Sequence, residues 1–192
     1  MALFLFLTPF GAFAMLSLLA PIQIGLLVAA ALALAVVAWD LFQGRSLKIM
    51  MASSAILFGA LGAYDMLLSQ GGSSTMAIRL MVDAGVLTIA LTSIALRVPF
   101  TVQYARERVA PEVHGQPAFM RINYILTWAW TAAFVLMLAA DILMVYAPSL
   151  PLWVSAALAF AARNAAIYFT NWYPQYRNGD LLPSAETDAA TG

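Results

Sequence analysis

Charged residues interrupt several long apolar stretches of this chain, and they are the side chains best suited to chemistry. A charge at the centre of a membrane costs about 2.5–3.5 kcal/mol on insertion scales, so such residues are rare and often functional. They permit two interpretations: a salt-bridge network that sets the register of a helical bundle, or a polar cavity that binds an ion or small solute. Both stay open. We call the set, with one neighbouring amide, the intramembrane polar residues: Asp65, Arg79, Asp83, Asp141, Arg163 and Asn164.

The spacing of these residues predicts specific ion pairs. Arg79 and Asp83 are four residues apart, so on one helix they can pair directly. Arg163 lies near the middle of its apolar stretch and cannot lose its proton, so it needs a partner within the protein. Asp141 and Asp83 are the acids at nearby depth. We therefore expect the fourth, fifth and sixth apolar stretches to pack together, with Arg163 facing one of them.

The apolar stretches themselves predict an all-α, polytopic membrane bundle. Of the 192 residues, 64% are hydrophobic and 9% are charged, whereas soluble domains contain about 25% charged residues. A membrane-spanning helix needs about 20 apolar residues. If Ala20-Pro21 separates the first two stretches, six spans are expected; if these form one broken helix, five. The expected spans cover about 2–19, 22–42, 49–68, 76–96, 124–146 and 152–172.

Small residues four apart predict close helix packing in two spans. The interpretation we favour is packing within a compact monomer, and a dimer face is the alternative. The residues are Ala55, Gly59 and Ala63 in the third span, and Ala157 and Ala161 in the sixth.

Basic residues are distributed unevenly between the connecting segments. With six spans, Arg79 alone lies toward the opposite side, just inside a span. The positive-inside rule then places both termini in the cytoplasm. Residues 1–173 form one transmembrane domain, and the polar residues 174–192 are expected to be a disordered cytoplasmic tail. The basic residues on the predicted cytoplasmic side are Arg45, Lys48, Arg97, Arg106, Arg108, Arg121 and Arg177.

The segment after the fourth span mixes apolar and basic side chains. It contains Phe100 and Tyr104 together with Arg106 and Arg108, a mixture that predicts a short amphipathic helix on the inner leaflet. An amphipathic linker is the simpler interpretation, and a docking surface for a cytoplasmic partner is the other. Asp40, at the end of the second span, is interpreted as a solvated helix-end charge without a special role.

Several classes of site are disfavoured by composition. The chain has no cysteine and one histidine, His114, so thiol chemistry and a histidine-based zinc site are not expected. No nucleophile with a base, phosphate-binding glycine loop or metal motif is recognisable. The net charge of zero gives no field for nucleic acid. We expect a protein that is not an enzyme, needs no cofactor or metal, and has membrane lipids as partners.

The order of these features resembles a known family. A basic loop, an arginine in the fourth span, a proline-initiated amphipathic segment and a stretch containing Asn123 and Trp128 are similar to bacterial intracellular septation protein A-like inner-membrane proteins. The resemblance implies a protein of the bacterial inner membrane with a role in cell-envelope maintenance or division, through contacts with other inner-membrane proteins. The pairing of Arg79 with Asp83 inside the span, and the presence of Arg163, depart from that pattern. The alternative function is a small channel or transporter that uses the intramembrane polar residues.

Overall fold

The computed structural model describes residues 2–147 and 149–177, and this part of the chain is helical without strands. The all-α prediction is therefore confirmed. Long apolar helices form wherever the sequence offers about 20 residues without a break, and proline or glycine lies at or near several of the ends. The helices are α1 (Ala2–Leu19), α2 (Ile22–Phe42), α3 (Ile49–Leu67), α4 (Thr75–Ala95), α5 (Phe100–Ala105), a 3-10 turn (Pro111–Val113), α6 (Pro117–Tyr146) and α7 (Leu152–Tyr176).

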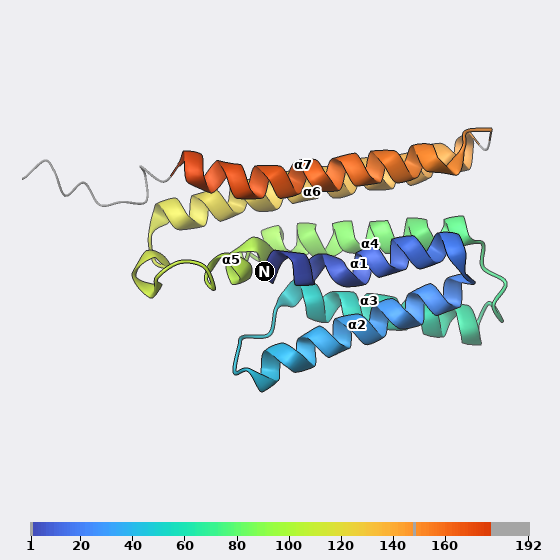
Figure 1. Cartoon of the computed structure of the whole chain (residues 1–192), viewed down its shortest axis with the longest axis horizontal. Helices are drawn as coiled ribbons and strands as arrows, with labels where there is room; N and C mark the ends of the chain where they lie inside the picture. Colours follow the sequence, from blue (N-terminus) through green and yellow to red (C-terminus); the bar gives the residue numbers. More distant parts are fainter. Residues whose placement is uncertain (1, 148, 178–192) are drawn as a thin grey trace, which may run out of the picture.

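The long helices run roughly antiparallel to one another (Figure 1). One end of the bundle, which we call the basic end, carries the start of α1, the α2–α3 loop, α5 and its flanking loops, and the end of α7. The α1–α2, α3–α4 and α6–α7 connections lie at the opposite end. The arginines and lysine of the predicted cytoplasmic loops therefore gather at one end of the structure.

Four helices in the described part are long and apolar enough to cross a membrane: α2, α3, α4 and α6. This indicates a membrane protein. In α1 the stretch Leu7–Leu19 is apolar but shorter than these four helices. Helix α7 is 25 residues long but is interrupted by polar side chains, among them Arg163 and Asn164. The count of six spans thus remains a prediction.

Most helix boundaries follow the prediction, and the differences have local causes. Helices α1 and α2 are separate and pack against each other, because Pro21 stands at the α2 N-terminus, where its missing N–H is not needed. Helix α6 begins at Pro117, earlier than the expected residue 124. Helix α7 continues to Tyr176 through Pro174, so the first residues of the expected tail are helical. The expected disorder of residues 178–192 lies outside the described residues.

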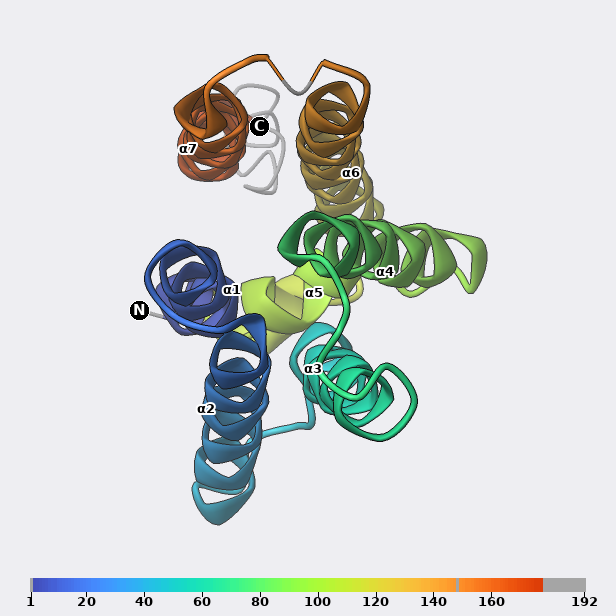
Figure 2. The same ribbon diagram turned by 90° about the vertical axis from the view of Figure 1, so that its right-hand side faces the viewer.

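The helices pack in chain order: α1 on α2, α2 on α3, α3 on α4, α4 on α6, and α6 on α7. Figure 2 shows the α6–α7 pair beside the group formed by α1–α4. The core centres on large buried side chains such as Phe58, whose ring lies 5.4 Å from those of Phe10 and Phe13. At Gly85 helix α4 approaches α3 so closely that a Cβ atom would meet Leu57 at 2.5 Å.

The predicted small-residue packing faces are not where the helices meet. Ala55 is buried, but Gly59 and Ala63 on α3, and Ala157 and Ala161 on α7, are exposed. The prediction of packing within the monomer is therefore wrong for these four residues. The reason is that α3 packs through larger side chains on another face, Met51 and Phe58 among them.

Candidate functional site

Asp141 is the one intramembrane polar residue that links three helices. The Nη2 atom of Arg79 on α4 lies 3.5 Å from Oδ1 of Asp141 on α6, and these side chains are 13% and 4% exposed. The hydroxyl of Ser155 on α7 donates a hydrogen bond of 2.8 Å to the same oxygen. Helix α6 packs against both α4 and α7, as predicted for the fourth to sixth spans. The partner differs from the prediction, because Asp141 pairs with Arg79 and not with Arg163.

The two pairs predicted from spacing do not form. The Arg79 guanidinium reaches across to Asp141, and Asp83 makes no ion pair with any described residue. Within the described part Arg163 makes no ion pair either, and its Nε atom is buried without a hydrogen-bond acceptor. Its guanidinium lies over the ring of Phe160, 5.4 Å from the centroid. Predicting that Arg163 faces Asp141 or Asp83 was wrong, because helix α7 turns another face toward α6, formed by Ser155, Ala162 and Ala166.

Asn164 and Asp65 have local roles. Asn164 is exposed and donates its amide to the carbonyl oxygen of Phe160, one turn earlier. Asp65 is buried near the end of α3, where it accepts a hydrogen bond of 2.7 Å from Nε2 of Gln23 on α2. The backbone N–H of Ser73 donates to its other oxygen at 3.3 Å. Asp65 therefore holds the α3–α4 loop against α2.

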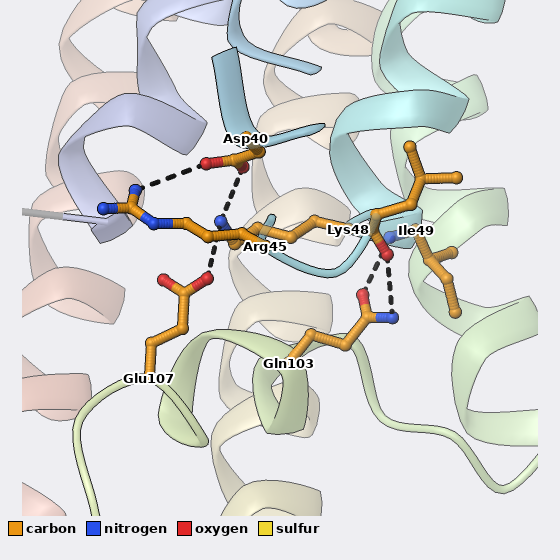
Figure 3. Close-up of polar contacts among 7 residues, drawn as sticks. Asp40, Arg45, Lys48, Ile49, Gln103 and Glu107 are labelled. Atoms are coloured by element: carbon orange, nitrogen blue, oxygen red, sulfur yellow. Dashed lines mark hydrogen bonds and ion pairs between the residues drawn. The ribbon is translucent and has the colours of Figure 1, made fainter. Parts of the chain in front are cut away.

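The structure reveals a buried ionic network at the basic end that the sequence analysis missed (Figure 3). Nζ of Lys48 lies 2.6 Å from Oδ2 of Asp40, and both side chains are 5% exposed. The same Nζ lies 2.9 Å from Oε1 of Glu107. Arg45 reaches the other oxygen of Asp40 at 3.4 Å from a more exposed position. Interpreting Asp40 as a solvated helix-end charge was therefore wrong.

The α5 region covers this network. Gln103 accepts a hydrogen bond of 2.7 Å from the backbone N–H of Ile49, and its amide donates to the carbonyl of Leu47 at 3.4 Å (Figure 3). Nζ of Lys48 lies 5.6 Å from the ring centroid of Tyr104, within the range of a cation–π contact. The sequence contains one clue to this network. Asp40 and Lys48 carry opposite charges on the two sides of the short α2–α3 loop, so both lie at the same end of the helical bundle.

The α5 segment itself is packed inside the bundle. Phe100 is fully buried and Tyr104 is 5% exposed, both within the main core. The prediction that these two rings face the inner leaflet was wrong, because α5 packs against α4 and α6. Arg106 and Arg108 are exposed, as the amphipathic pattern requires. Burial raises the pKa of the Tyr104 hydroxyl above its ordinary value, and the charges of Asp40 and Glu107 raise it further.

A cavity of about 390 Å³ opens between α5, α6 and α7 at the basic end. Asn123 lines it and is 1% exposed. Its Nδ2 donates to the carbonyl of Phe119 at 2.9 Å, while its Oδ1 is buried without a hydrogen-bond partner. Arg108 also lines the cavity. Trp128, the other residue of the family-like stretch, is 53% exposed and takes no part in this site.

A second cavity of about 350 Å³ lies next to the first, and Ile122 lines both. Arg121 and Arg177 contribute to its wall. The described residues contain no group of three or more metal-ligating side chains. His114 instead stacks on Phe119, with ring centroids 5.7 Å apart.

Comparison with protein-family models, curated proteins and solved structures finds no match for this chain. The resemblance to septation protein A-like proteins therefore stays a prediction, and the site must be interpreted from its own geometry.

Proposed function

We propose that this chain is a non-enzymatic, multi-pass protein of the bacterial inner membrane that works through contact with another membrane protein. Helix α7 is the contact helix in this proposal, and Arg163 is its central polar contact. The sequence resemblance adds the setting, which is maintenance or division of the cell envelope. In the proposed topology six helices span the membrane and both termini are cytoplasmic, since the basic residues gather at one end of the bundle.

The observation that carries the proposal is the state of Arg163. It lies 11 residues from the start of α7, so about 17 Å along the helix at 1.5 Å per residue. That is too deep for its side chain to reach water easily. A guanidinium in this position needs an anionic or carbonyl acceptor, yet no described acid pairs with it and its buried Nε lacks an acceptor. An aspartate or glutamate on a neighbouring protein's helix would pair with the Arg163 guanidinium, which is partly exposed on α7.

Helix α7 is also the helix least covered by the rest of the bundle. It packs mainly on α6, and large side chains elsewhere on it are exposed, including Trp153, Phe160 and Tyr168. Ala157 and Ala161 are exposed on the same helix and would let a second helix approach closely.

The transport alternative requires the intramembrane polar residues to share a cavity. They are instead divided among separate places: Asp65 beside α2, Arg79 with Asp141, and Arg163 over Phe160. None of them lines either of the two cavities at the basic end. This division favours the contact function over transport.

Cysteine crosslinking in native membranes tests the proposal directly, because the chain has no cysteine of its own. Single cysteines at Ala157, Ala161 and Tyr168 report on α7, and a cysteine at the exposed Ile56 of α3 is the matched control. We expect an adduct with one discrete membrane protein from the α7 positions and none from Ile56. In the same background, Arg163→Gln should abolish the adduct while the purified variant remains folded.

Four results would count against the proposal. Equal adducts from Ile56 and α7 would mean random collision, and an adduct of twice the chain mass would assign α7 to self-association. An adduct that survives Arg163→Gln would remove the role of the arginine. Solute flux in reconstituted vesicles that depends on Arg163 or Asp141 would favour the transporter instead.

A further inference from the structure

The cavity between α5, α6 and α7 has the features of a ligand site. Its volume of about 390 Å³ falls within the range of about 300–1,000 Å³ typical of small-molecule pockets. Much of its wall is apolar, with Phe119 and Leu126 among the lining residues, and a few polar groups converge on it. It lies at the basic end, beside the last turns of α7 and the first turns of α6.

Asn123 is the buried polar residue of this cavity. The buried Oδ1 atom is an acceptor without a donor, on a side chain that is 1% exposed. The orientation of the amide is set by its Nδ2, which donates to the carbonyl of Phe119 at 2.9 Å, so exchanging the two atoms would break that bond. A buried acceptor left unpaired is costly, and native structures rarely leave one without a partner. The cavity therefore calls for a ligand that donates hydrogen bonds to Oδ1.

Helix α7 supplies a second acceptor on the opposite wall. Pro174 lies inside α7 and has no N–H, so the carbonyl of Thr170 loses its usual helical hydrogen bond. Both residues line the cavity. The Thr170 hydroxyl is already engaged, because it donates to the carbonyl of Ala166 and accepts from Nε1 of Trp130. What Thr170 offers a ligand is thus its backbone carbonyl.

Positive charge surrounds the opening. Arg108 lines the cavity from the loop after α5, and its side chain is exposed. The neighbouring cavity adds Arg121 and Arg177. Basic pockets between membrane helices at the cytoplasmic face are suited to lipid headgroups, and arginine binds phosphate oxygens through two parallel hydrogen bonds.

We propose that this cavity binds the phosphoethanolamine headgroup of a membrane phospholipid. The ammonium group donates to Oδ1 of Asn123 and to the Thr170 carbonyl, and the phosphate lies against Arg108. The acyl chains leave along the apolar side of the cavity toward the bilayer. A primary ammonium carries three N–H donors, which matches the two acceptors offered by Asn123 and Thr170, with the cationic Arg108 also lining the cavity. This assignment is independent of the contact function of α7.

Delipidated, purified protein titrated with defined phospholipids tests the assignment, with lipid adducts counted by native mass spectrometry. Phosphatidylcholine is the decisive comparison, because its quaternary ammonium keeps the charge and phosphate but has no N–H donor. We expect phosphatidylethanolamine to bind at least about tenfold more tightly, the effect of one hydrogen bond involving a charged group, because phosphatidylcholine can make neither of the two. Soluble phosphoethanolamine should bind far more weakly than the lipid, because it lacks the acyl chains.

Variants separate the two halves of the headgroup. Asn123→Leu should reduce the preference for phosphatidylethanolamine over phosphatidylcholine, because only the Thr170 carbonyl then accepts from the ammonium. Arg108→Gln should weaken binding of both lipids, since both carry the phosphate. Arg106→Gln is the matched control, because Arg106 is exposed two residues away and does not line the cavity.

The wild-type titration is sufficient even if Asn123→Leu does not fold. Equal binding of the two lipids by wild type, or equal effects of Arg106→Gln and Arg108→Gln, would overturn the proposal. Soluble phosphoethanolamine binding as tightly as the lipid would assign the cavity to a free metabolite and overturn the lipid assignment.

Discussion

Replacing Lys48 by methionine tests whether the buried network at the basic end holds the bundle together. Methionine keeps the length and much of the volume of the lysine side chain but removes its charge. Two carboxylates, Asp40 and Glu107, then lose the ammonium that lies 2.6 Å and 2.9 Å from them. Breaking a buried ion pair by removing one partner costs about 3–5 kcal/mol, because the remaining charge stays buried.

The contacts that remain after Lys48→Met place its free-energy cost at the lower end of this range. Asp40 keeps Arg45 at 3.4 Å, and Glu107 is 25% exposed and can turn toward water. We therefore expect Lys48→Met to lower the free energy of unfolding by about 3 kcal/mol, the lower end of that range. Asp40→Asn should cost less, about 1–3 kcal/mol, because Lys48 keeps Glu107 as a partner. Arg45→Met is the matched control, and its 42% exposed side chain should contribute at most about 1 kcal/mol.

Reversible unfolding in mixed detergent micelles, followed by circular dichroism, measures these differences. The double variant of Lys48 and Asp40 should be less destabilised than the sum of the single variants by about 2 kcal/mol, since it leaves no buried Asp40 charge without an ammonium, and the remaining Glu107 is 25% exposed. The reasoning is refuted if Lys48→Met is as stable as Arg45→Met, or if the single effects simply add.

Three further predictions concern other parts of the molecule. The buried Tyr104 hydroxyl has a raised pKa, so the folded state resists its ionisation; stability should fall as pH rises above about 10, the ordinary tyrosine pKa, and Tyr104→Phe should flatten this fall in alkaline thermal unfolding. Asp141→Asn should destabilise the purified protein by about 2–3 kcal/mol, whereas Asp83→Asn, which breaks no ion pair, should change stability little; equal effects would contradict the Arg79–Asp141 assignment. A reporter inserted at Gly71 should be active only in its periplasmic form, and cytoplasmic activity would reverse the proposed topology.

Local features of the sequence were sufficient for the helices themselves. Apolar length predicted where α1 to α4 run, and Pro21 predicted the break between α1 and α2. These features succeed because a membrane-spanning segment must satisfy its own backbone hydrogen bonds, so its extent depends on consecutive residues. The separation of basic from uncharged connections followed from the same reasoning, since it needs only the order of the spans.

Which side chains meet was decided by the tertiary structure. The four-residue spacing predicted that Arg79 pairs with Asp83, but the rotation of α4 against α6 places the Arg79 guanidinium beside Asp141 instead. Phe100 belongs to a segment with an amphipathic sequence pattern, yet its side chain is buried because α5 packs against α4 and α6. Asp40 and Lys48 form a buried network with Glu107, which is far from them in the sequence and lies 2.9 Å from Nζ of Lys48 in the folded chain. Partners of this kind depend on how rigid helices are rotated and docked, and that information lies in packing between distant segments rather than in local sequence.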